Sequence, residues 1–184
     1  ENVKEKRRIF GWKKHEARSV AGITMGELNA IERIEATDEY FVKVLAVMLG
    51  LISPKGKGSK RIDWEGAGYG IARERVLELQ FIRAYRYFIE IQNELKGVAK
   101  AWKKLEMPLT PQEANAQVQR KNRGMSTICL GYCQLVGGAI QPSDVWHLRW
   151  STVYLAYEAE RDKNMAQRKL AQMNKPKPSK SRRR

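Results

Sequence analysis

The sequence predicts an all-α protein, an irregular helical bundle with one long helix, a glycine-rich loop and basic terminal arms. Two observations predict this class: apolar residues recur at the spacing of amphipathic helices, and helix-start motifs precede several of these stretches. No segment fits a strand better than it fits a helix. With 184 residues, of which 42% are hydrophobic, the chain is long enough for one domain with a buried core.

Charge divides the chain into a nearly neutral body and basic extremities. The formal net charge is +15, and residues 1–18, 55–61 and 161–184 carry +4, +4 and +9, so the remainder is slightly negative. A balance this basic predicts a polyanionic partner. We expect three parts: a basic N-terminal arm at 1–18, a helical domain at 19–173 with a glycine-rich loop at 53–70, and a disordered basic C-terminal tail at 174–184.

The first two helices are predicted from their caps. Thr24 and Glu27 have the spacing of a capping box, so a helix is expected over residues 25–35. Thr37 is expected to cap a second, strongly apolar helix, because acidic residues follow it in the positive first turn. That helix is expected to end at Gly50, since glycine readily adopts the left-handed conformation of a C-terminal cap.

Loop chemistry separates these helices from a longer one. Five glycines and one proline in residues 53–70 predict no continuous helix or strand there, and Trp64 and Tyr69 are expected to anchor the loop to the body or to a neighbouring subunit. A helix over residues 71–106 would approach ~54 Å, so we expect a bend, with Gly97 as the weakest point. Its apolar stripe comprises Phe81, Tyr85, Phe88, Leu95, Ala99 and Trp102, widened by Val76, Leu79, Ile82 and Ile89.

Two more helix starts lie in the second half of the chain. Thr110 and Glu113 form another capping box, with proline at the first helical position. The uncharged run that follows Gly124 contains too many glycines to span a membrane, and it predicts a buried helix ending at Gly137. Ser143 is expected to open the last helix. Its aromatic residues recur at intervals of four, at Trp146, Trp150 and Tyr154.

Few residues offer catalytic or metal-binding chemistry. Cys129 and Cys133 lie one helical turn apart, which favours free buried thiols over a disulfide. His15 and His147 would complete a Cys2His2 set, but zinc fingers hold their histidines close together in sequence. The glycine-rich loop lacks the spacing, the hydroxyl residue and the preceding strand of a P-loop. We therefore predict no enzyme, no catalytic or metal-binding residues and no cofactor.

Two groups of side chains are candidates for contacts with partners. The basic group is expected to contact nucleic acid or an acidic protein surface, and it comprises Arg7, Arg8, Lys13, Lys14, Lys55, Lys57, Lys60, Arg61, Lys175, Lys177, Lys180, Arg182, Arg183 and Arg184. The aromatic group is expected at a subunit interface, with the chain's own core as the alternative, and it comprises Trp64, Tyr69, Trp102, Trp146, Trp150 and Tyr154.

Two parts of the sequence resemble a known class of proteins. Residues 23–28, Ile-Thr-Met-Gly-Glu-Leu, and the acidic start and aliphatic run of 38–49 are similar to the opening of small helical tail-assembly and neck-region proteins of tailed bacteriophages. Residues 144–150, leading to 154–158, are similar to their closing helix. The resemblance implies a helical structural protein. The long helix and basic tail depart from a transient assembly chaperone and favour a retained ring or neck component.

The sequence therefore predicts a non-enzymatic structural or assembly protein, a bacteriophage neck, tail or ring component in the virion or in the host cytoplasm during assembly. Its expected partners are other protein subunits, in a homo-oligomer or a larger assembly, and DNA, but no small-molecule substrate. The alternative is a nucleic-acid-binding protein whose basic tails make sequence-independent phosphate contacts. Attachment to an anionic membrane surface is a third interpretation, which lacks a lipidation signal.

Overall fold

The computed structural model describes residues 17–54, 61–106, 115 and 124–174. These residues form, in chain order, η1 (Val20–Gly22), α1 (Met25–Glu32), α2 (Tyr40–Met48), α3 (Ala67–Leu77), α4 (Phe81–Lys104), α6 (Met125–Leu135), α7 (Pro142–Val145) and α8 (Trp150–Met173). In this part of the chain the strand-like pairing is an isolated bridge between Thr24 and Arg149. The all-α prediction is confirmed.

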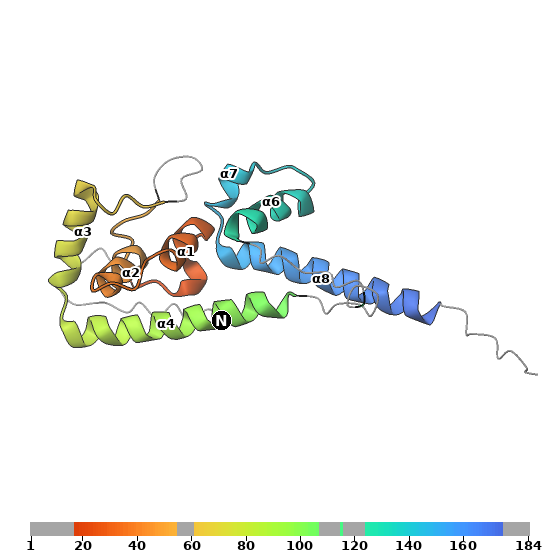
Figure 1. Ribbon diagram of the computed structural model, residues 1–184, viewed down its shortest axis with the longest axis horizontal. Coiled ribbons are helices and arrows are strands. Elements are labelled where there is room, and N and C mark those ends of the chain that lie inside the picture. The colour runs from red at the N-terminus through yellow and green to blue at the C-terminus, as the bar shows by residue number, and fades with distance from the viewer. Residues whose placement is uncertain (1–16, 55–60, 107–114, 116–123, 175–184) are drawn as a thin grey trace, which may run out of the picture.

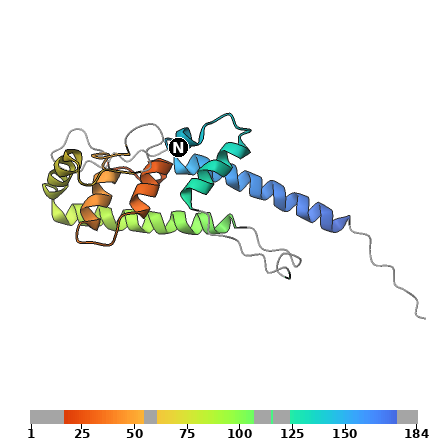
Figure 2. The same cartoon turned by 45° about the horizontal axis from the view of Figure 1, so that its top comes forward.

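The helices gather around two apolar clusters. Helices α1 and α2 lie over one side of α4, and α3 rises from the N-terminal end of α4 and packs against α2, while α6 and α7 lie against the first turns of α8 (Figure 1; Figure 2). The larger cluster centres on α2, where Val44, Leu45 and Met48 are fully buried, and the smaller one joins α6 to α7 and α8. Trp102 and Trp150 pack against both clusters, so the two parts share a continuous apolar interior.

The first helix begins as its capping box predicts. Glu27 N–H donates to Thr24 Oγ1 at 3.2 Å, and Thr24 N–H donates to Glu27 Oε2 at 2.9 Å, which satisfies two amides at the helix start. The helix ends at Glu32, three residues before the expected end at residue 35. The predicted cap at Thr37 is wrong, because residues 37–39 form a turn and α2 begins after Glu39 without a side-chain capping bond.

Glycine terminates α2 as predicted. Gly50 has φ +66°, a conformation that costs residues with a Cβ about 1 kcal/mol or more. Its N–H donates to Val47 C=O, and Leu51 N–H donates to Ala46 C=O, both at 2.9 Å. These two bonds define a Schellman motif, which pairs carbonyls that the helix end leaves free.

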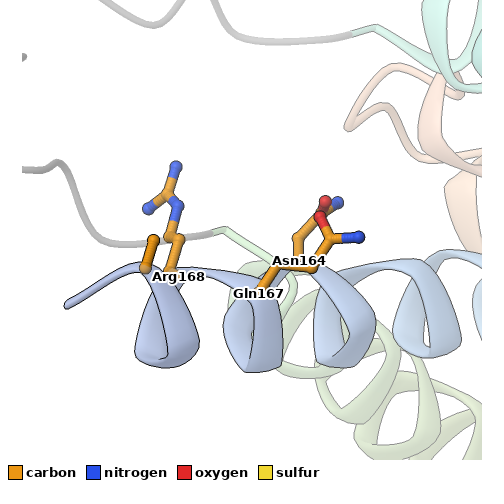
Figure 3. Close-up of a pocket in the computed structure, with 4 residues that line it drawn as sticks. Asn164, Gln167 and Arg168 are labelled. Carbon is orange, nitrogen blue, oxygen red and sulfur yellow. The ribbon is translucent and has the colours of Figure 1, made fainter. Parts of the chain in front are cut away.

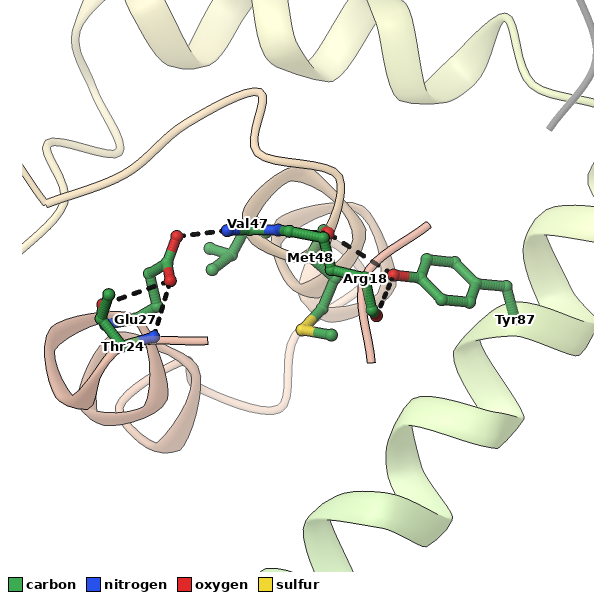
Figure 4. A network of polar contacts seen from close by, with 6 residues as sticks. All are labelled: Arg18, Thr24, Glu27, Val47, Met48 and Tyr87. Carbon is green, nitrogen blue, oxygen red and sulfur yellow. Dashed lines mark hydrogen bonds and ion pairs between the residues drawn. The ribbon is translucent and has the colours of Figure 1, made fainter. Parts of the chain in front are cut away.

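Arg18 fastens the segment before η1 to the first two helices (Figure 4). Its Nη2 donates to Glu27 Oε1 at 2.9 Å and also to Val47 C=O, while its Nε donates to Met48 C=O at 3.1 Å. Tyr87 of α4 donates its hydroxyl proton to Arg18 C=O at 2.8 Å. One arginine thereby pairs a buried carboxylate and two carbonyls at the end of α2.

The predicted long helix is two helices. The loop at 53–70 ends at Gly66 rather than at residue 70, because α3 starts at Ala67, and α3 ends at Leu77. Gln80, with ψ 114°, breaks the helical path before α4 begins. Gly97, the expected weak point, lies inside an uninterrupted α4 of 24 residues. The local sequence gives no sign of the break. It arises where α3 turns to pack across α2, which buries Ala72 and Val76 in the larger cluster.

The predicted end of the central apolar helix is confirmed, whereas the start of the last helix is wrong. Gly137 has φ +70° and follows the end of α6. The last helix begins at Trp150 rather than at Ser143, which lies in the short α7. The segment between α7 and α8 pairs with the backbone around the start of α1. Met25 N–H donates to Leu148 C=O at 2.8 Å, and Trp150 N–H donates to Ile23 C=O at 3.2 Å.

Gly131 allows α6 and α8 to pack closely. Tyr157 donates its hydroxyl proton to Ile128 C=O at 2.7 Å, and a Cβ at position 131 would lie well inside contact distance of that hydroxyl oxygen. We expect Gly131→Ala to lower the free energy of unfolding by about 1–2 kcal/mol through overpacking. In a Tyr157→Phe background the same change should be neutral or stabilising, because alanine favours a helix over glycine by about 1 kcal/mol.

Thermal denaturation of the four variants of this double-mutant cycle measures the coupling. Gly97→Ala in α4 is the matched control, because a Cβ there meets nothing within 4 Å and should raise stability slightly. Equal losses from Gly131→Ala in both backgrounds would contradict the predicted clash with the hydroxyl.

Candidate interaction surface

Four exposed apolar side chains form a patch at the start of α4. Phe81 is 69% exposed, Ile82 60%, Tyr85 49% and Ile89 42%. Phe81 stacks on Tyr85 with 5.9 Å between ring centroids, and it also lies 6.3 Å from the Phe41 ring of α2. We call these four residues the α4 patch. It is the part of α4 where large apolar groups meet solvent.

The α4 patch corrects the single apolar stripe expected for this helix. The buried side of α4 is centred on Ala84, Ile91 and Val98. At 100° per residue, Ile82 and Ile89 lie roughly 160–180° around the helix from that side. The apolar residues expected for this helix span a wider arc than one packed face requires, so the sequence already indicated a second apolar surface. Periodicity does not show which part of the arc packs inside the chain.

A second cluster joins α3 to α2 through one carboxylate. Glu39 accepts a hydrogen bond from the Tyr69 hydroxyl and another from Arg73 Nε at 2.7 Å. The ammonium group of Lys43 lies 5.6 Å from the Trp64 ring and 5.9 Å from the Tyr69 ring, within cation–π range. Trp64 and Tyr69 were expected to anchor the glycine-rich segment to the body or to a neighbouring subunit, and in the structure both rings contact the body of the chain through Lys43.

This cluster shifts the titration of its members. The hydrogen bond from Tyr69, and then that from Arg73, holds the pKa of Glu39 below its usual range. Burial, together with the hydrogen bond to Glu39, raises the pKa of Tyr69 above its ordinary value. The carboxylate form of Glu39 and the neutral form of Tyr69 are therefore the forms that the fold favours.

Glu39→Gln should weaken the dependence of stability on acid pH. The lowered pKa means that Glu39 stabilises the fold above pH 4.5, its unperturbed pKa, and that this contribution is lost as pH falls further. Glu39 is partly exposed, so we expect the contribution to be a fraction of 1 kcal/mol, or about 1–2 °C in Tm. Thermal melts of both proteins between neutral and acid pH measure it. Parallel Tm profiles for the two proteins would contradict the prediction.

The structure places the six predicted interface aromatics in contacts within the chain. Trp146 is buried, and Trp150 donates its indole N–H to Val20 C=O at 2.6 Å. Trp102 packs edge-on against Tyr154, with ring centroids 5.7 Å apart, and its indole N–H is buried without a hydrogen-bond partner. Trp64 and Tyr69 belong to the cluster around Glu39 that joins α3 to α2. Their contacts favour the core alternative, whereas the exposed patch on α4 was not among the predicted interface residues.

Most of the predicted basic contacts lie outside the described residues. These are Arg7, Arg8, Lys13, Lys14, Lys55, Lys57, Lys60, Lys175, Lys177, Lys180, Arg182, Arg183 and Arg184, and the predicted helix start at Thr110 also lies outside. Arg61 is described, and its side chain is exposed. The described residues are close to electrically neutral, so the excess of positive charge belongs to the remaining segments.

A pocket of about 480 Å³ lies beside the second half of α8 (Figure 3). Its described lining consists of Asn164, Gln167, Arg168 and Ala171, which all come from one helix. Asn164 also donates an amide hydrogen to Glu160 at 3.2 Å. Among the described residues the pocket thus presents a guanidinium and two amides but no convergent set of acid, base and nucleophile.

Over the described ranges, no group of three or more His, Cys, Asp and Glu residues is arranged to hold a metal ion, and no helix is both long and apolar enough to cross a membrane. Cys129 and Cys133 are buried free thiols, as predicted. No family model, curated protein or solved structure matches the chain.

Proposed function

We propose that the chain is a non-enzymatic structural or assembly protein that packs against other protein subunits. The α4 patch is the observation that carries this proposal. Phe81 and Tyr85 each leave roughly 100 Å² of side chain in solvent, and the two isoleucines bring the patch to about 400 Å². A contiguous apolar surface of this size is about the largest that a monomeric protein exposes, and such patches often serve in binding.

The setting that we propose is a tailed bacteriophage particle, as a neck, tail or ring component, or the host cytoplasm during its assembly. This part rests on the resemblance of residues 23–28, 38–49, 144–150 and 154–158 to helical phage proteins. An all-α chain with two helices of 24 residues is compatible with that role. The basic segments would then contact DNA or acidic surfaces of neighbouring subunits.

Nucleic-acid binding is the second candidate function, and the distribution of charge favours it. The last ten residues contain six Lys and Arg residues and no acidic residue. Contacts between such side chains and phosphates give affinity without sequence preference, and they weaken steeply as salt rises. Deletion of residues 175–184 should therefore weaken binding to duplex DNA, and unchanged affinity would exclude a role for this tail.

Light scattering with and without duplex DNA, at about 50 and 200 mM salt, separates the two functions. A structural protein should show a mass above 21.2 kDa without DNA at both salt concentrations. A DNA-binding protein should gain mass only with DNA, and lose it at the higher salt concentration. A mass of one chain under all four conditions would contradict both.

A further inference from the structure

The side of α4 that carries the α4 patch continues as a row of lysines. Lys96 and Lys103 come seven and fourteen residues after Ile89, and Lys100 comes eighteen residues after Ile82. At 3.6 residues per turn, these intervals correspond to about two, four and five whole turns. The three lysines, which we call the lysine row, therefore lie on the same side of the helix as the patch, two to four turns beyond Ile89.

The lysine row is set apart from the acidic residues of its own helix. All three lysines are exposed, and none of them forms an ion pair with another described residue. Glu90 and Glu94 are the acidic residues of α4, and they lie roughly 110° and 150° around the helix from the centre of the row. Glu94 accepts the N–H of Val20. The solvent-facing side of α4 thus changes along its length from apolar to cationic.

The described helices leave this side of α4 uncovered along its length. Ala84, Ile91 and Val98, which α4 buries, lie on the opposite side, where α1 and α2 pack (Figure 1; Figure 2). From Ile82 to Lys103 the exposed side measures about 32 Å at 1.5 Å per residue. One elongated partner can therefore contact the patch and the lysine row together.

We propose that this side of α4 binds a helix of a neighbouring subunit that is apolar over one half of its contacting side and acidic over the other. The inference rests on the proposed function, and it names the chemistry of the subunit that packs on the α4 patch. The apolar half buries the patch, and the acidic half pairs with the lysine row. A partner helix of about 21 residues has the required length.

Another α4 does not fit this side along its full length. A parallel second copy would place lysine row against lysine row, and an antiparallel copy would press each lysine row onto the other's apolar patch without a counter-charge. A lipid surface also fits poorly, because a helix that lies in a membrane interface buries an apolar face along its length, whereas the apolar groups here end at Ile89. Duplex DNA would match the lysines but leave the patch in solvent.

Synthetic peptides test this pairing with the full chain. Two peptides of about 21 residues carry leucine on one half of a helical face and glutamate on the other, and they differ in which half comes first. Fluorescence anisotropy should show that at least one of them binds about 10-fold more tightly than a matched peptide with lysine in place of glutamate. If neither glutamate peptide binds more tightly than its lysine counterpart, the proposal is overturned.

Variants of the chain locate the binding. Ile82→Glu should weaken binding of the glutamate peptide about 10-fold or more, and Lys100→Glu about 5-fold or more. Leu155→Glu and Lys169→Glu on α8 are the matched controls, because both residues are exposed and lie outside this side of α4. Raised salt should also weaken binding to the wild-type chain. Circular dichroism confirms that all four variants remain helical.

The outcomes distinguish this inference from the proposed function. Loss of binding with Ile82→Glu but not with Lys100→Glu overturns the acidic half of the partner and leaves the α4 patch as a contact site. Binding that neither variant weakens lies elsewhere on the chain and overturns the proposal. If neither glutamate peptide binds, and Lys100→Glu instead lowers the affinity for duplex DNA, the lysine row is a nucleic-acid surface and the proposal is wrong.

Discussion

Leu45→Ala is expected to lower the free energy of unfolding by about 3 kcal/mol, and Tm by roughly 6–12 °C. Leu45 is fully buried at the centre of α2, within the larger apolar cluster. Its truncation removes buried methyl groups and leaves a cavity that the neighbouring helices fill only in part. Thermal or urea denaturation followed by circular dichroism at 222 nm, the usual helix signal, measures the loss.

Leu155→Ala provides the comparison for this result. The residue type and the substitution are the same, but Leu155 on α8 is 60% exposed, so the loss should stay within about 0.5 kcal/mol. Similar losses at the two positions would contradict the placement of the larger cluster around α2.

Arg18→Met should cost about 2–3 kcal/mol. It removes the guanidinium from Glu27, whose carboxylate is almost fully buried, and from the carbonyls of Val47 and Met48. A buried charge that loses its partner is strongly destabilising, and the partial exposure of Arg18 places the loss below the 3–5 kcal/mol of fully buried pairs. Methionine keeps most of the length of the side chain, so the lost interaction is mainly electrostatic.

Arg73→Met is the matched control for Arg18→Met. Arg73 also pairs with a glutamate, at 2.7 Å from Glu39, but both side chains are partly exposed. Exposed pairs contribute about 0–1 kcal/mol, so this variant should melt close to the wild-type temperature. If the two arginine variants lose equal stability, burial of the Glu27 carboxylate is not what makes Arg18 important.

Helix ends that depend on nearby residues were predictable from the sequence. The capping box at Thr24 and Glu27 and the glycines that follow α2 and α6 act over three to six residues, so their patterns are visible locally. Thr37 failed as a cap because the turn places Glu39 at the helix start instead. A residue with capping chemistry marks a helix start only when the backbone reaches the required conformation.

Breaks caused by distant parts of the chain were not predictable in this way. Residues 146–150 leave the helical path because their carbonyl and amide groups pair with Ile23, Met25 and Gly26, which lie more than 100 residues earlier. The break at Gln80 likewise has no proline or glycine beside it. The α4 patch was missed for a related reason, since helical periodicity identifies apolar sides but not which of them find a partner within the chain.

The backbone pairing between residues 23–26 and 146–150 also sets an order of events during synthesis. The amide groups of Met25 and Gly26 find their acceptors, Leu148 C=O at 2.8 Å and Trp146 C=O at 2.9 Å, only in the last quarter of the chain. The ribosome releases N-terminal segments first, so α1 emerges long before these acceptors do. The segment that contains α1 therefore reaches its final structure only after residue 150 has left the exit tunnel, and a nascent chain arrested earlier should expose Met25 to protease.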